Sequence, residues 1–355
     1  MASENLPIVF IGSGPVSLLK AYLMSKKEPN QAILILDNNL NFGGAWYSDL
    51  RSDNSEIESG CHIWSYNKEV YHYLSTELEL DMVKMKPAPL FVKGKLKVPY
   101  SIKNTVDSYK FLSKNLIRFN FKVFSTIKES DKYTLKIFGK QNQYAKMGSI
   151  DLVKELKKRI ESSANIKVIN GIRVNSIELN DSAYLISEAE KIEAKKIFMT
   201  SVTDLKTITH FDSSVQIEQK QVDYIHFLLK LEQPINKRIS YWRLMEDQVI
   251  HRISDISYQT SYKENLLLVG IKQDAFETIS ENKLLEHCKG SLLKLRLIDT
   301  QDHVKLDKSY VYPTFYIDMD QRKTISEMDR DKLELLHSTD LMYGFHALIK
   351  EEKLT

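Results

Sequence analysis

Short apolar runs alternate with amphipathic stretches along the chain, and this pattern predicts an α/β protein. The run Ile8–Ile11 is continuously apolar, which is typical of a strand buried on both faces. A glycine turn follows it, after which leucine and tyrosine recur at helical spacing over residues 18–23. A second apolar run at 32–36 predicts the next strand. The order strand, turn, helix, strand predicts a βαβ unit at the start of the chain.

The same patterns predict the rest of the architecture. We expect helices over 105–116, 149–160 and 282–297, a hairpin over 90–98, and strands over 166–169, 191–200, 222–231 and 266–271. We therefore predict a Rossmann-like domain with a mainly parallel sheet and helices on both faces, and a substrate domain with a mostly antiparallel sheet. The first domain is expected to comprise 1–84, 147–210 and 320–355, and the second 85–146 and 211–319.

The first turn carries the chemistry of a dinucleotide site. Gly12 permits a tight turn, and Gly14 has no side chain to keep a pyrophosphate from the backbone. The third glycine of this motif is replaced by Ser17, and Pro15 and Val16 open the helix, whose N-terminus favours an anion. An ordinary βα turn is the competing interpretation of the glycines alone.

An acidic residue supports the dinucleotide interpretation. Asp37 ends the second strand 23 residues after Gly14, close to the spacing of about 20 expected for a carboxylate that binds a ribose hydroxyl. Asn38 follows it, and the loop continues to Gly43, Gly44, Ala45 and Trp46. Two adjacent glycines at this place let the main chain approach a bulky ligand.

Composition and charge narrow the class of protein. The chain has 355 residues, 43% hydrophobic and 27% charged, as in an ordinary globular protein of about two domains. A net charge of +3, with interspersed signs, argues against a nucleic-acid partner. We expect no signal peptide and no membrane span, since no apolar run approaches 18 residues. Two cysteines indicate a reducing compartment, so we expect a cytoplasmic protein.

These motifs resemble those of UDP-galactopyranose mutases, within the FAD-binding superfamily that has a Gly-Gly motif just past the ribose-binding acid. The segment from Ser59 to Trp64, which includes His62, is similar to the Gly-x-His-Ile-aromatic segment of the mutases. The hairpin at 90–98, the segment 249–254 and the pair Tyr312-Pro313 also resemble mutase elements. The resemblance implies an FAD cofactor and a small-molecule substrate such as a nucleotide sugar.

The resemblance also implies roles for individual residues. Arg252 would contact a substrate phosphate, and Tyr312 would lie near the sugar; Arg243 is better explained as a surface residue. His62 is either an active-site group or a hydrogen-bonded structural histidine. Val174 would meet the adenine with its backbone. Ser338 or Thr339 would cap a helix beginning near Asp340, whose N-terminus would face a phosphate. No metal site is predicted.

Three functions stay open at this point. The first is a flavoenzyme that acts on a nucleotide sugar or a related polar metabolite. The second is a flavin-dependent oxidase or dehydrogenase of the same superfamily. The third is a dinucleotide-binding relative without turnover, because the chain has no counterpart of the mutases' tryptophan-glycine-arginine segment and no Gly-Gly-Arg motif near its C-terminus.

Overall fold

The structure of the protein is a computed structural model of the 355-residue chain. It describes residues 6–46, 48–58, 64, 67–84, 90–93, 96–99, 143–188, 190–200, 204–236, 242–259, 262–336 and 341–354. The expected helix at 105–116 lies outside these residues, as do His62, Ser338, Thr339 and Asp340.

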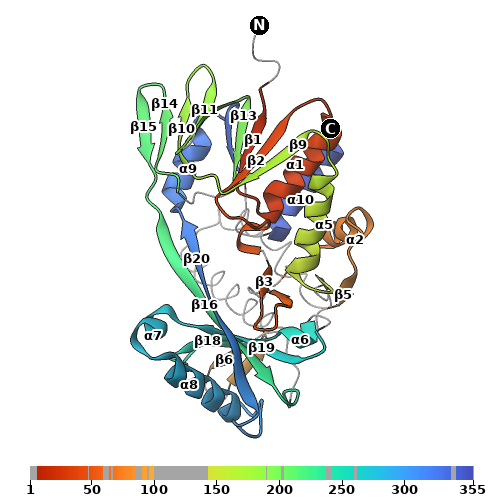
Figure 1. Cartoon of the computed structure of the whole chain (residues 1–355), viewed down its shortest axis with the longest axis vertical. Coiled ribbons are helices and arrows are strands. Elements are labelled where there is room, and N and C mark those ends of the chain that lie inside the picture. The colour runs from red at the N-terminus through yellow and green to blue at the C-terminus, as the bar shows by residue number, and fades with distance from the viewer. Residues whose placement is uncertain are drawn as a thin grey trace, which may run out of the picture.

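A five-stranded parallel sheet lies in the upper half of the molecule as drawn in Figure 1. Its strand order is β21 (Leu333–Leu335), β13 (Lys196–Met199), β1 (Ile8–Ile11), β2 (Ile33–Asp37), β9 (Ile166–Asn170). The central strand β1 pairs in parallel with both β2 and β13. Its four residues are at most 6% exposed, which explains why the strand is apolar at every position.

Helices cover one face of the parallel sheet, and a second sheet covers the other. Phe10 and Ile33 pack with residues of α1 (Pro15–Lys27), α5 (Ser149–Glu161) and α10 (Leu341–Leu354). On the opposite face, Ile11 and Leu36 share a core with α9 (Met319–Glu327) and a second sheet of order β12 (Lys191–Ala194), β11 (Ala183–Ser187), β10 (Val174–Leu179), β14 (Thr207–His210), β15 (Ser213–Gln216). Helices therefore lie on both faces, as expected, but on this face a sheet that was not expected provides most of the cover.

The single strand expected over 191–200 is in fact two strands in different sheets. β12 pairs antiparallel with β11, whereas β13 joins the parallel sheet beside β1. Lys195 lies between them, and its N–H donates to the carbonyl of Pro7. The chain thus passes from one layer to the other within one residue, and the apolar pattern does not record the change.

The second half of the molecule is built on a seven-stranded sheet, here called the large sheet. Its order is β20 (Val304–Tyr316), β16 (Lys220–Leu231), β19 (Asn265–Ile271), β18 (Ile250–Asp255), β17 (Trp242–Leu244), β6 (Leu90–Lys93), β7 (Leu96–Pro99), and all pairs except β17–β6 are antiparallel. Residues of α8 (Glu281–Lys294) and of the adjoining α7 (Gln273–Thr278) pack on one face. The long strands β16 and β20 reach from this sheet toward the first half (Figure 1).

Short elements complete the described fold. A hairpin of β3 (Ser48–Leu50) and β4 (Glu56–Glu58) places Ile57 against Leu228 and Leu268, on the face of the large sheet opposite α8. The remaining elements are η1 (Gly44–Trp46), α2 (Lys68–Thr76), β5 (Met82–Lys84), β8 (Gln143–Ala145) and α6 (Ile256–Gln259). In the part of the chain that the structure describes, no helix has the length and apolar character needed to cross a membrane. The exact division into two discontinuous domains stays a prediction.

Candidate functional site

The first glycine turn lies at the carboxyl edge of the parallel sheet, where ligands of open α/β folds bind. Gly12 has φ 96°, a left-handed conformation that glycine adopts without strain, and its N–H donates to the carbonyl of Leu36. Gly14 is the N-cap of α1, and no side chain caps this helix end. Among the residues that the structure describes, none would have a heavy atom within 4 Å of a Cβ placed on Gly14, apart from its chain neighbours. Open space therefore lies beside the N-terminus of α1.

The second glycine pair lies directly against the first turn. The N–H of Gly43 donates to the carbonyl of Ser13 over 3.1 Å. Gly44 has φ 54°, and a Cβ there would lie 3.4 Å from the Cα of Gly14. The two glycine segments, which are about thirty residues apart, thus form one wall of main-chain atoms. Such a wall suits a ligand that needs close approach to the backbone.

Asp37 connects these segments. Its Oδ2 accepts hydrogen bonds from both the N–H and the hydroxyl of Ser13, each 2.6 Å long, and its Oδ1 accepts from the N–H of Asn39 at 2.8 Å. The residue is 5% exposed. A carboxylate has about four lone-pair positions, so these bonds leave about one for a ribose hydroxyl. Asp37 therefore fixes the turn as well as offering a ligand contact, a role that the motif alone did not indicate.

Sequence analysis missed a pair of hydroxyls at the same edge. The side-chain oxygens of Ser17 and Thr200 are 2.7 Å apart, and Thr200 directly follows β13, the strand next to β1. Thr200 also donates to the carbonyl of Ile11. Its position as the first polar residue after the apolar run 197–199 was the available signal. The pair fastens the start of α1 to the sheet.

The other predicted cofactor residues lie around this edge in different settings. Asn38 donates from Nδ2 to the carboxylate of Asp204 at 2.9 Å. Val174 is 3% exposed and belongs to the core between the parallel sheet and the second sheet. Val16 is buried at the start of α1, Pro15 is its first residue, and Ala45 and Trp46 belong to η1. The helix α10 begins at Leu341, close to the predicted start, although Ser338 and Asp340 themselves lie outside the described residues.

Two predicted catalytic residues lie on the large sheet, apart from the glycine wall in sequence. The Nη2 atom of Arg252 on β18 is 2.6 Å from the Nε2 atom of His226 on β16. Tyr312 on β20 donates its hydroxyl to Asp49 Oδ2 at 3.1 Å, and its ring centroid is 6.1 Å from that of His226. Burial, with the charge of Arg252 the next cause, lowers the pKa of His251 to about 4, so this side chain is neutral at pH 7.

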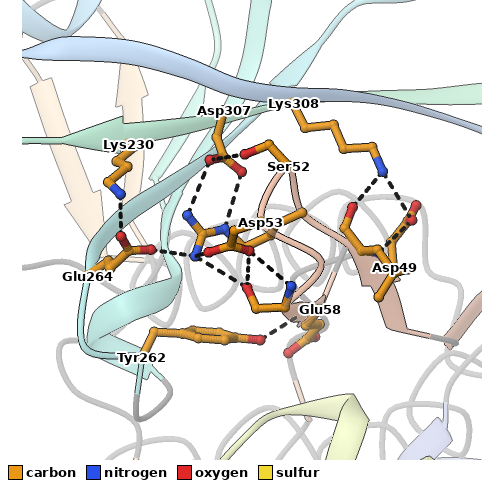
Figure 2. Close-up of polar contacts among 12 residues, drawn as sticks. Asp49, Ser52, Asp53, Glu58, Lys230, Tyr262, Glu264, Asp307 and Lys308 are labelled. Atoms are coloured by element: carbon orange, nitrogen blue, oxygen red, sulfur yellow. Dashed lines mark hydrogen bonds and ion pairs between the residues drawn. The ribbon is translucent and has the colours of Figure 1, made fainter.

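A buried ionic cluster joins the β3–β4 hairpin to the large sheet (Figure 2). Arg51, 5% exposed at its side chain, makes two 3.2 Å contacts with Asp307 and also pairs with Glu264 and Asp53. Although burial opposes the charged form, the hydrogen bonds to Asp307 and Glu264 raise the pKa of Arg51. Lys230 of β16 also pairs with Glu264. Because the hairpin begins two residues after Trp46, this cluster fastens the segment after the glycine pair to the large sheet.

A parallel sheet with a glycine turn at its carboxyl edge, joined to a large and mostly antiparallel sheet, defines a Rossmann-like α/β protein. Solved structures show which proteins share this fold. Reduced UDP-galactopyranose mutase matches with a TM-score of 0.67 and 11% identity, over 99% of this chain and 94% of the mutase. Putrescine oxidase bound to putrescine matches with a TM-score of 0.65 and 11% identity, over 99% of this chain and 98% of the oxidase.

A third structure, an oxidoreductase from Methanosarcina mazei, matches with a TM-score of 0.55 and 12% identity over 87% of this chain and 88% of its own. No protein-family model and no curated protein matches the sequence. The predicted fold class is confirmed, and the resemblance to UDP-galactopyranose mutase is confirmed at the level of the fold. Identities this low leave cofactor and substrate open.

Proposed function

We propose that the protein binds FAD, with the pyrophosphate beside Gly14 and the N-terminus of α1. The observation that carries this proposal is the open space at Gly14 bounded by Gly44. Amide N–H groups at a helix end and the positive end of its dipole favour an anionic group there. Asp37 would accept one ribose hydroxyl through Oδ1, and Val174 would meet the adenine. The N-terminus of α10, with Ser338 and Asp340, would also face a phosphate of the cofactor.

We propose further that the protein is a flavin-dependent enzyme that acts in the cytoplasm on a small polar metabolite, with a nucleotide sugar as the first candidate. When bound, the flavin would supply the redox or nucleophilic chemistry, and the protein would supply position and charge. Arg252 would bind a substrate phosphate through its planar fork, Tyr312 would lie near the sugar, and His62 would orient the flavin or share a proton. The mutase-like fold and the arginine on the large sheet support this choice.

A flavin-dependent oxidase or dehydrogenase is the second candidate. Putrescine oxidase matches this chain as well as the mutase does, with TM-scores of 0.65 and 0.67. The missing mutase loop motif also keeps open a relative that binds the dinucleotide without turnover.

A visible spectrum of the purified protein, recorded before and after dithionite, tests the cofactor. We expect the two flavin absorption bands, bleached on reduction; a colourless protein that takes up no FAD on titration contradicts the proposal. Equilibrium binding of UDP-sugars to the oxidised and reduced protein then tests the substrate class. Arg252→Ala should weaken this binding and leave flavin content unchanged, and Arg252→Lys should restore it only in part, because lysine lacks the planar fork. Wild-type protein that binds no UDP-sugar in either redox state would rule out the nucleotide sugar.

A further inference from the structure

A row of polar residues crosses four strands of the large sheet. Tyr310 on β20 lies opposite His226 on β16, His226 lies opposite Gly270 on β19, and Gly270 lies opposite Arg252 on β18. Residues directly opposite one another on neighbouring strands point to the same face of a sheet. His226 is 2% exposed, so it is a buried histidine in the middle of this row.

The glycine in the row makes room for a second histidine beside this contact. His226 and Arg252 are two strands apart, a separation of about 9–10 Å between their backbones. His251 is the extra residue of a β-bulge in β18, and its ring lies over Gly270, where a Cβ would be 2.5 Å from Nε2 of His251. Beside this ring, Nη2 of Arg252 lies 2.6 Å from Nε2 of His226.

Hydrogen-bond chemistry fixes the state of this histidine. A guanidinium group only donates hydrogen bonds, so Nε2 of His226 must accept. His226 is therefore neutral, with its proton on Nδ1. The contact uses one N–H of the fork of Arg252 and fixes the plane of the guanidinium, which decides where a planar bidentate ligand can bind.

We infer that His226 is a positioning residue for Arg252 and that, through Arg252, it sets the affinity of the large sheet for a phosphate or diphosphate group. This inference rests on the proposed function of Arg252. It adds a buried acceptor two strands away. An arginine held in one orientation loses less conformational entropy on binding than a freely rotating one, so the pair pre-organises the anion site.

The test is the binding of UDP to the flavin-loaded protein, measured by calorimetry. His226→Leu removes the acceptor and keeps the site apolar, and we expect it to weaken UDP binding roughly tenfold, as for the loss of one charge-assisted hydrogen bond. His226→Gln offers an amide oxygen and should restore most of that loss. In an Arg252→Ala background, His226→Leu should have no further effect. His303→Leu, an exposed histidine before β20, serves as the control and should bind UDP like wild type.

The outcomes separate the inference from the function on which it rests. Equal losses in the Leu and Gln variants, or losses at 226 and 252 that simply multiply, would overturn the positioning role. Wild-type protein that fails to bind UDP would instead overturn the proposed nucleotide-sugar function, and the positioning role with it. Melting curves and flavin content show whether each variant folds. If His226→Leu alone does not fold, the UDP affinity of His226→Gln, compared with that of the double variant His226→Leu with Arg252→Ala, tests the positioning role instead.

Discussion

The substitution Gly14→Ala separates cofactor binding from folding. In the structure, Gly14 has φ −63° and ψ 158°, a conformation open to any residue, and an added Cβ would meet no atom of the described residues within 4 Å beyond its chain neighbours. The methyl group would thus fit the ligand-free fold and enter the space assigned to the pyrophosphate.

The magnitudes follow from the same geometry. Alanine is a poorer N-cap than glycine by about 0.5–1 kcal/mol, but it lowers the entropy of the unfolded chain by a similar amount, so stability should change by less than about 1 kcal/mol. A displaced phosphate that loses one charge-assisted hydrogen bond from a helix amide should lose about 1.5–3 kcal/mol of binding. That free energy corresponds to an FAD affinity lower by about 10- to 100-fold.

Two measurements are needed: flavin fluorescence during titration with FAD, and thermal unfolding of the same samples. Gly290→Ala in α8 is a matched control, because its nearest neighbour is Gln301 at 4.0 Å; it should bind FAD normally and be slightly more stable. If Gly14→Ala binds FAD with wild-type affinity, the pyrophosphate does not lie at this turn. If the variant unfolds, the space beside Gly14 is not as described.

Three further predictions concern stability. Arg51→Met should lower the free energy of unfolding by about 3–5 kcal/mol, because Asp307 loses its bidentate partner in a buried site; urea denaturation checks this, and a loss below about 1 kcal/mol would contradict it. Since burial and neighbouring cations lower the pKa of His251 from 6.5 to about 4, the unfolded chain binds that proton more tightly. The stability from neutral His251 is therefore complete above pH 6.5 and is lost as the pH falls toward 4, by about 3 kcal/mol. His251→Leu should flatten that part of the pH profile, and an unchanged slope would be evidence against it. Gly44 has φ 54°, and an added Cβ would lie 3.4 Å from the Cα of Gly14, so Gly44→Ala should destabilise the protein by about 1–2 kcal/mol, in contrast to Gly14→Ala. Thermal unfolding checks this, and equal stability of the two variants would contradict the packing of the two glycine segments.

Local patterns predicted the elements whose environment is uniform along their length. β1 is buried on both faces and β16 is continuously buried from Ile225 to Leu229, so an apolar run was sufficient to predict each. The helix α5 has a regular apolar stripe and was expected within one residue of its observed end. By contrast, the division of 191–199 between two sheets depends on a bond from Lys195 to Pro7, a partner distant in sequence.

The candidate site was predicted only in part, because local patterns reveal motifs but not contacts between residues distant in sequence. The glycines and Asp37 form a motif with fixed spacing, which sequence can show. The role of Asp37 in holding Ser13 depends on the direction of its carboxylate, which spacing does not determine. Arg51 meets Glu264 and Asp307 across 213 and 256 positions, and no local pattern brings such charges together. The contact of His226 with Arg252 also depends on strand order, which brings residues from two strands of the large sheet together.

Gly270 constrains how the chain can change over time. A Cβ at position 270 would lie 2.5 Å from the ring of His251, so a substitution there needs a smaller residue at 251 in the same lineage. The two positions should therefore covary among relatives: glycine at 270 where 251 is a histidine, and larger residues at 270 only where 251 is small. A single Gly270→Ala change should be poorly tolerated, whereas the same change beside His251→Ala should be accepted. The substitutions open to this part of the large sheet are thus paired, and a lineage would have to acquire them in a particular order.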